Sequence, residues 1–425
     1  MPTQIPKSAF RLIKNVMIKE NITQNDIKNV VKEFVETNDI TDKILLVCPD
    51  ITRYHSHAGE IACALYEALK EKADVTVMIA LGTHEGMTRA EAEKMYPTIP
   101  FERIVNHNFR KDTVKLGVVP KEFVETVSKG ICDFPIDVNV NAKVMEKGVT
   151  VISVGQVVPH EVVGMANGNK NLFVGLGGSS MINSSHFLGA CCDMEKIMGR
   201  DHSSVREVFD YAERNYLKDV NLYYFQTVVE NGKVIGLFVG KGREPFEKSV
   251  RLSQEKNLIY LDKPLKKVVV NLDEEEFKST WLGNKAVYRT RLAIETGGDL
   301  IILAKGVERF GEDKAIDSLI RKYGYTGRDN ILKKAAEEDD LKENLSAAAH
   351  LIHGSSNGRF DITYCVEKLT KEEVEGVNFK YIPYKEAVEK YNPEKLVDGF
   401  NTVDGEEIFY ISNPAVGLWS ATKLF

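Results

Sequence analysis

The sequence predicts an α/β protein of two domains, each with a mainly parallel sheet and with a cleft between them. Short, continuous apolar runs alternate with segments that have helical spacing, and this order is found in both halves of the 425-residue chain. Continuous apolar runs are typical of parallel strands that are buried on both faces. Residues 262–264 separate the two halves. We therefore expect an N-terminal domain over residues 1–261 and a C-terminal domain over residues 262–425.

The first half contains strong signals for individual elements. A capping box at Thr88 and Glu91 predicts the start of a helix. Asn231-Gly232 predicts the turn of a hairpin that spans residues 222–239. Strands are expected over residues 43–48, 74–81 and 149–158, and helices over residues 59–72 and 203–216.

The second half repeats the alternation, which favours a second α/β domain rather than a helical or all-β one. Strands are expected over residues 267–272, 300–304, 360–366, 380–383 and 407–412. Helical structure is expected over residues 275–295, 315–323, 328–350 and 384–391.

Composition excludes several classes of partner. A net charge of −6 does not favour nucleic-acid binding. No apolar run approaches the roughly 20 residues that span a bilayer, and residues 1–20 lack the apolar core of a signal peptide. The 6 cysteines form no C-x-x-C pair, as expected of reduced thiols in the cytoplasm. We expect a cytoplasmic protein without a membrane or nucleic-acid partner.

The polar residues best suited to chemistry fall on three loops. Residues 50–53 follow the strand at 43–48, residues 82–85 follow the next strand, and residues 160–170 follow the strand at 149–158. In open α/β sheets, ligands bind beyond the carboxyl ends of the strands. The three loops therefore predict one site.

These loops carry side chains with a functional and a structural interpretation. Arg53 could bind a carboxylate or phosphate, or form a surface salt bridge. Asp50 could orient Arg53 or a histidine, or serve as a turn residue. His84 and His160 could each exchange a proton near neutral pH, although single loop histidines are often structural.

Two further residues complete the set. Lys170 has an amine that could bond covalently, in a glycine-containing loop that does not match the P-loop pattern. His186 has no second ligand at H-x₃-H or C-x₂-C spacing. One protein ligand holds a free metal ion poorly, so a metal at His186 would take its remaining ligands from a cofactor.

The set of motifs resembles the nickel-pincer lactate racemase family. The similar segments are residues 50–53, residues 81–84, the H-x₃-G-x₃-G-x-K run within residues 159–170, and Ser185-His186. Their order is also similar. The resemblance implies a pyridinium mononucleotide whose two thio-acyl groups hold nickel through sulfur, carbon and sulfur (pyridinium-3-thioamide-5-thiocarboxylic acid mononucleotide).

By resemblance, Lys170 would tether this cofactor, with Gly168 and Thr52 beside it, and His186 would be the protein ligand of nickel. His84 and His160 would be acid/base groups on opposite faces of the substrate. The remaining roles by resemblance are substrate binding, assigned to Arg53, Asp50, Lys285 and Trp281. Separate enzymes would make the cofactor.

The function implied is a racemase or epimerase that inverts C2 of a 2-hydroxy acid through a 2-keto acid, with the α-hydride held by the cofactor. Several positions depart from the family. The usual Ser-Gly-Gly-Arg-Lys-Ser is replaced by residues 166–171, Tyr54 replaces a proline, and Trp281-Leu282 replaces Tyr-Gln near the substrate. We therefore expect a substrate that is not restricted to lactate, such as a larger or sugar-derived hydroxy acid.

Three alternatives remain. A zinc-type hydrolase would use His84, His160 and His186 around an activated water. A non-catalytic homologue would bind a nucleotide or hydroxy acid without turnover. A nicotinamide dehydrogenase fits the fold class, but no G-x-G-x-x-G follows the first predicted strand.

Overall fold

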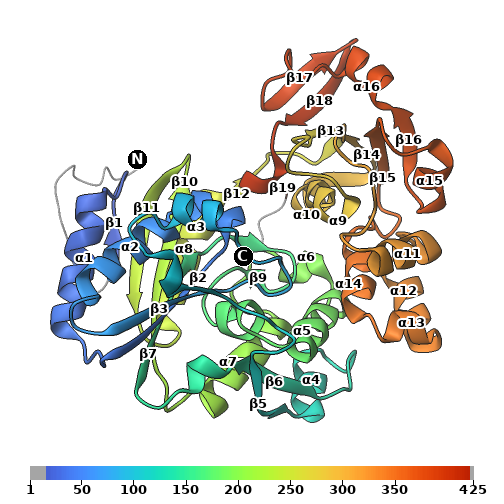
Figure 1. The fold of residues 1–425 in the computed structure, drawn as a ribbon. Coiled ribbons are helices and arrows are strands. Elements are labelled where there is room, and N and C mark those ends of the chain that lie inside the picture. Colours follow the sequence, from blue (N-terminus) through green and yellow to red (C-terminus); the bar gives the residue numbers. More distant parts are fainter. Residues whose placement is uncertain (1–15, 422–425) are drawn as a thin grey trace, which may run out of the picture.

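The computed structural model describes residues 16–421 and contains two large sheets, each covered by helices on both faces (Figure 1). The expected fold class, α/β with mainly parallel sheets, is confirmed. Of the segment tested for a signal peptide, residues 1–15 lie outside the described part. No helix within residues 16–421 is long and apolar enough to cross a membrane.

The first sheet has 7 strands in the order β1-β11-β10-β7-β2-β3-β4. From β10 to β4 all neighbours are parallel, whereas β11 pairs antiparallel with β10 and with β1. Its strands are β1 (Val16–Ile18), β2 (Lys43–Cys48), β3 (Asp74–Ile79), β4 (Ile104–Asn106), β7 (Val149–Gln156), β10 (Asn221–Glu230) and β11 (Lys233–Gly240).

Alternation along β2 shows how both faces of this sheet are buried. Ile44 and Leu46 belong to one hydrophobic cluster, with α1 and α2, whereas Leu45 and Val47 belong to a second cluster, with α5 and α7. The helices of this half are α1 (Gln24–Thr37), α2 (Ala58–Leu69), α3 (Arg89–Met95), α4 (Lys121–Val127), α5 (Ser179–Cys191), α6 (Met194–Ile197), α7 (Ser204–Tyr216) and α8 (Glu244–Asn257).

Two small antiparallel pairs complete this half. One is β5 (Thr113–Val119) with β6 (Ile136–Asn141), beside α5 and α7. The other is β8 (Pro159–His160) with β9 (Gly164–Met165), directly after β7. The second pair folds residues 159–165 into a tight hairpin.

The second sheet has 6 strands in the order β16-β15-β14-β13-β18-β17, parallel except for β17. Its strands are β13 (Leu265–Asn271), β14 (Ile294–Leu303), β15 (Asp361–Val366), β16 (Lys380–Pro383), β17 (Gly399–Val403) and β18 (Glu406–Ile411). Its helices are α9 (Thr280–Gly283), α10 (Lys285–Thr290), α11 (Lys314–Tyr323), α12 (Arg328–Glu337), α13 (Asp339–Lys342), α14 (Leu345–His353), α15 (Lys371–Gly376) and α16 (Tyr384–Lys390).

The two halves meet along several contacts. Helix α14 packs against α5, and β12 (Leu258–Tyr260) pairs with β19 (Leu418–Ser420) near the end of the chain. Buried Arg291 donates from Nε to Glu195 on α6 at 3.1 Å. Residues 262–264 lie between β12 and β13, and we propose this point as the boundary between domains 1–261 and 262–425.

One stretch of the second half differs from expectation. Residues 275–295, expected to be mostly helical, contain only the short helices α9 and α10, and β14 already begins at Ile294. The Ser279 hydroxyl accepts from the Leu282 N–H and caps α9, which begins at Thr280, five residues after the expected start. The strand expected at 300–304 is longer because it includes Gly297-Gly298.

Candidate functional site

The three loops selected from the sequence begin at one edge of the first sheet. They follow β2, β3 and β7, which are neighbours in the order β7-β2-β3 and run parallel. The carboxyl ends of parallel neighbours meet at the same edge, where α/β proteins bind ligands. The three loops, residues 50–53, 82–85 and 160–170, therefore begin next to one another at this edge of the sheet.

Asp50 and His84 form a hydrogen-bonded pair at this edge. Asp50 caps the 3₁₀ helix Ile51–Ser56 and accepts from the Thr52 N–H at 2.9 Å. Its other carboxylate oxygen lies 2.7 Å from Nδ1 of His84. Burial raises the pKa of Asp50, but the hydrogen bonds from His84 and Thr52 outweigh it and lower the pKa to about 2. An ionised carboxylate only accepts, so Nδ1 of His84 carries hydrogen and Nε2 is free to accept a proton.

His160 has the opposite ring state. It lies in β8, and the backbone N–H of Val162 donates to its Nδ1 at 3.1 Å. Burial lowers the pKa of His160 well below the ordinary histidine value; the negative charge of Glu161 opposes the shift, and the positive charge of Lys170 adds to it. The ring is therefore neutral, with its hydrogen on Nε2.

The two imidazoles thus differ in what they offer a substrate. His84 presents a proton acceptor at Nε2, whereas His160 presents a hydrogen-bond donor at Nε2. A hydroxyl group can donate to the first ring and accept from the second, so the two rings together can hold and orient it.

Lys170 stands at the start of the π-helix Asn171–Gly175. Among residues 16–421, its ammonium group has no ion-pair or hydrogen-bond partner. Burial lowers the pKa of Lys170 to about 8, and the positive charge of Arg53 contributes in the same direction. Such a lysine has far more neutral, nucleophilic amine near neutral pH than an ordinary lysine has.

The loop that leads to Lys170 is held by a buried guanidinium group. Arg206 on α7 is 1% exposed and donates to the carbonyls of Met165 at 2.6 Å and Asn167 at 3.2 Å. Gly168 has φ +62°, and a Cβ there would lie 3.3 Å from Nη1 of Arg206. A larger residue at 168 would therefore both strain the backbone and press on this contact.

His186 has one ring nitrogen free for a metal ion. It lies on α5, and its Nδ1–H donates to the carbonyl of Ile182 at 2.7 Å. Burial, followed by the charge of Lys170, lowers the pKa of His186 to about 4, so the ring is neutral. A neutral imidazole whose Nδ1–H is held by a carbonyl, with the Nε2 lone pair free, is the usual form of a metal-ligating histidine.

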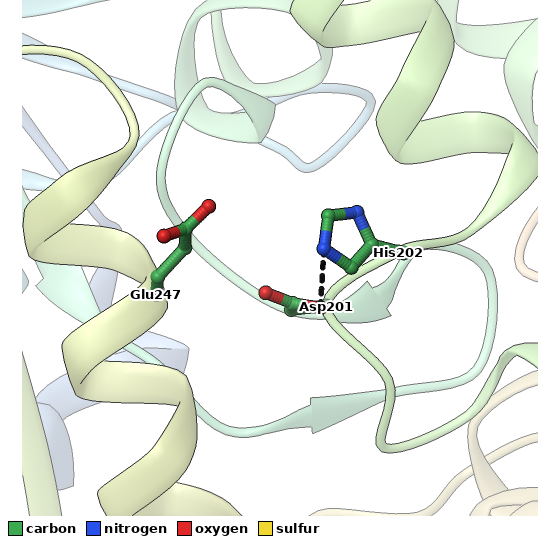
Figure 2. Close-up of side chains that lie close together, drawn as sticks. All are labelled: Asp201, His202 and Glu247. Carbon is green, nitrogen blue, oxygen red and sulfur yellow. Dashed lines mark ion pairs between the residues drawn. The ribbon is translucent and has the colours of Figure 1, made fainter.

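His186 belongs to no cluster of protein ligands. Within residues 16–421, one group of potential ligands lies close enough to share an ion: Asp201, His202 and Glu247, with Glu247 projecting from α8 (Figure 2). Arg243 already contacts the carboxylates of Asp201 at 3.3 Å and Glu247 at 3.0 Å, so we assign no metal to that group. A metal at His186 would need ligands that are not protein side chains.

The second half contributes cations to the same region. Lys285 begins α10 and lies 3.4 Å from Glu276. Burial lowers the pKa of Lys285, and the charge of Arg53 is the next cause, which places the two cations near each other. Trp281 instead stacks on the ring of His350, with 4.1 Å between centroids, and packs against the core of the second sheet.

The structure adds three residues that the sequence did not single out. Arg289, 8% exposed, donates from Nη1 to the carbonyl of Pro159 at 2.9 Å. Burial raises the pKa of Glu161, but its interaction with the His160 ring and the positive charge of Arg289 outweigh burial and hold the pKa far below its usual range. His353 is 4% exposed, and burial, opposed by the charge of Glu161, lowers its pKa to about 3. No motif links these residues, because more than a hundred positions separate Arg289 from Pro159.

Comparison with known families fits this geometry. Residues 4–199 match the family model described as the lactate racemase N-terminal domain. That stretch contains Asp50, His84, His160, Lys170 and His186. The match supports a relationship to the lactate racemase family, and the second half of the chain lies outside it. No curated protein sequence matches the chain.

Two solved structures share the fold over nearly the whole chain. A crystal structure of a protein from Thermotoga maritima has 24% sequence identity and a TM-score of 0.80, covering 95% of this chain and 99% of its own. The lactate racemase apoprotein from Thermoanaerobacterium thermosaccharolyticum has 15% identity and a TM-score of 0.72, covering 95% of this chain and 94% of its own. At these identities the likeness concerns the fold, including the arrangement of both sheets.

The hairpin that carries His160 depends on a glycine. Gly164 has φ +83°, and a Cβ there would lie 2.1 Å from the carbonyl oxygen of Arg200, whereas Gly148 has φ +75° with nothing within 4 Å. We expect Gly148→Ala to cost about 1–2 kcal/mol, from backbone strain alone, and Gly164→Ala to cost clearly more. Urea unfolding of both variants measures the difference; equal losses of stability would contradict the close contact at Gly164.

The lowered pKa of Lys170 predicts selective reactivity. In cofactor-free protein, acylation of Lys170 by an amine-reactive reagent should rise with pH around a midpoint near 8, because only the neutral amine reacts and an ordinary lysine has a pKa of about 10.4. Lys70, whose pKa is raised by its hydrogen bond with Glu67, is the control in the same digest. Peptide mass spectrometry over a pH series gives both curves, and coinciding curves would refute the prediction.

Proposed function

We propose that this protein is a nickel-pincer-dependent racemase or epimerase of 2-hydroxy acids. The proposal rests on two neighbouring groups. His186 is a neutral imidazole that belongs to no cluster of protein ligands within residues 16–421, and the amine of Lys170 lies close enough to lower the pKa of His186. A metal that takes one protein ligand, next to a lysine able to bond covalently, indicates a metal carried by a tethered organic group.

The residues present fit that cofactor. Lys170 would form the covalent tether, His186 would supply the nickel ligand through Nε2, and Thr52 and Gly168 lie on the two loops that flank the tether. Gly168 has a positive φ, and a Cβ there would lie 3.0 Å from Phe246 and 3.3 Å from Arg206, so the loop beside the tether has no room for a side chain at this position. When bound, the nickel-pincer nucleotide would accept the α-hydride of the substrate and return it.

The other residues would bind the substrate and transfer its hydroxyl proton. Arg53 and Lys285 bring two cations from the two halves of the chain toward a substrate carboxylate. His84, oriented by Asp50, would take the hydroxyl proton at Nε2. His160 would hydrogen-bond the substrate oxygen through its Nε2–H. For the opposite enantiomer it would take the hydroxyl proton in the tautomer whose Nε2 carries no hydrogen, since inversion requires a proton carrier on each face of the planar 2-keto acid.

The substrate class is proposed to extend beyond lactate. By resemblance, Trp281 stands where the family has a tyrosine near the substrate. Its ring stacks on His350, and we expect this exchange to change the surroundings of the substrate. A larger or sugar-derived 2-hydroxy acid is the class that we expect. Separate cofactor-making enzymes are the maturation partners that this function requires.

Two alternatives have less support. A zinc-type hydrolase needs about three protein ligands and a bound water, and among residues 16–421 no such group includes His186. A non-catalytic homologue would bind the nucleotide or hydroxy acid without turnover. The complementary ring states of His84 and His160 favour catalysis over binding alone.

The test is to produce the protein together with the cofactor-making enzymes of a lactate racemase, then measure intact mass and nickel. We expect a covalent adduct that maps to Lys170 and about one nickel per adduct. Lys170→Ala should abolish the adduct, whereas His186→Ala should keep the adduct and lose nickel, because the two residues hold different parts of the group. Absence of adduct and nickel, under conditions that mature the lactate racemase itself, would reject the proposal.

The fate of the α-hydrogen distinguishes the chemistry. With a panel of 2-deuterated 2-hydroxy acids, we expect inversion at C2 with the deuterium retained, because a hydride carried by the cofactor does not mix with water. His84→Gln and His160→Gln should each lower kcat about 10²–10⁴-fold, the usual contribution of one acid/base group. Chiral chromatography with mass detection measures both. Loss of deuterium to solvent would indicate removal of the α-hydrogen as a proton instead.

A further inference from the structure

The segment that carries His160 is held from both halves of the molecule. On the β9 side, the carbonyl of Gly164 accepts from Gly199 at 2.9 Å, and the carbonyl of Val163 accepts from the Ser203 hydroxyl at 3.1 Å. On the β8 side, the carbonyl of Pro159 accepts from Arg289 of α10. This last bond reaches the peptide that joins Pro159 to His160, and it comes from the second half of the chain.

We propose that Arg289 is a positioning residue for His160, so that contact between the two halves sets the orientation of one acid/base imidazole. The inference rests on the proposed function and goes beyond it, because it names a residue that does not touch the substrate. The carbonyl of Pro159 and the amide of His160 belong to one planar peptide group. Holding that carbonyl at 2.9 Å orients the peptide plane that contains the N and Cα of His160, and the strand pairing of His160 with Gly164 then sets the direction of its side chain.

The surroundings of Arg289 show that this contact is costly to maintain. Its side chain is 8% exposed, and its buried Nε has no hydrogen-bond partner within residues 16–421. Within a protein interior, an unsatisfied donor and a buried cation both oppose folding. The nearby charge of Glu161 offsets part of that cost, since Glu161 and Arg289 each favour the charged form of the other.

The orientation of His160 also depends on its own loop. Val162 donates to Nδ1, and His160 pairs with Gly164 across the hairpin. These local bonds fix the ring relative to the hairpin, whereas Arg289 fixes the hairpin relative to the second half. His84 is held instead by Asp50, which lies in the first half. Loss of the Arg289 bond should therefore disturb one imidazole and spare the other.

Arg291, two positions further along, provides a matched control. It is also buried, at 1% exposure, and it also joins the two halves, through Glu195 on α6 at 3.1 Å. Its hydrogen bonds reach the carbonyls of His353 and Ser355 rather than the hairpin. Arg289→Gln and Arg291→Gln remove the same charge from the same interface, but only the first removes the bond to Pro159.

The first measurement is NMR spectroscopy of the cofactor-free full-length protein with ¹³C-labelled histidine. The His160 and His84 resonances are assigned with the variants His160→Gln and His84→Gln. We expect Arg289→Gln to shift or broaden the His160 signal and to leave His84 in place. Arg291→Gln should leave both in place. Arg289→Lys, which keeps the charge and one donor, should restore the His160 signal in part and serves as the test variant if Arg289→Gln does not fold.

The second measurement uses the matured enzyme. Arg289→Gln should lower kcat about 10²-fold, the loss expected from a displacement of about 1 Å in a catalytic group, with a much smaller change in KM. An unchanged His160 signal in Arg289→Gln, or equal shifts in the Arg289 and Arg291 variants, would overturn the inference. A shifted signal in a protein that has no racemase activity at all would uphold the positioning role and reject the proposed function.

Discussion

Parallel pairing of β7, β2 and β3 is the constraint on which the rest of the structure depends. It places three loops, which begin at residues 50, 82 and 157, at one edge of the first sheet. The apolar alternation of β2, which supplies both hydrophobic clusters of that sheet, keeps the strands in this register. A shift of one residue would turn each apolar set to the wrong face, so the same packing that stabilises the fold also aligns the site.

Burial then changes the chemistry of the groups brought together. Lys170, His160 and His186 all have pKa values lowered chiefly by burial. Removal from water disfavours the charged form of an amine or imidazole, which leaves a nucleophilic amine and two neutral rings. Asp50 is the exception: it stays ionised because His84 and Thr52 donate to it. One buried region thus holds both the ionised and the neutral groups that the proposed reaction requires.

Contact between the two halves completes the site. Lys285 and Arg289 both come from α10, and α14 packs against the helix that carries His186. The match to the lactate racemase N-terminal domain covers residues 4–199 only, yet the proposed substrate cations and the support for the His160 hairpin include residues beyond it. In this proposal, the second half contributes to substrate specificity and to the positioning of His160, whereas the residues proposed to hold the cofactor lie in the first half.

The sequence by itself determined the α/β class, the parallel strands and the three loops, because continuous apolar runs and capping signals are local properties. It located the strands near residues 43–48 and 74–81 and the turn at Asn231-Gly232 closely. It did not predict the division of residues 275–295 into α9 and α10, where the cap at Ser279 starts a new helix. Only the tertiary structure decided which ring nitrogen of His84 and of His160 carries hydrogen. It also decided the hydrogen bonds from Arg206 to the loop before Lys170 and from Arg289 to Pro159. Those features depend on atoms far apart in the chain, whose proximity is fixed by packing rather than by any local pattern.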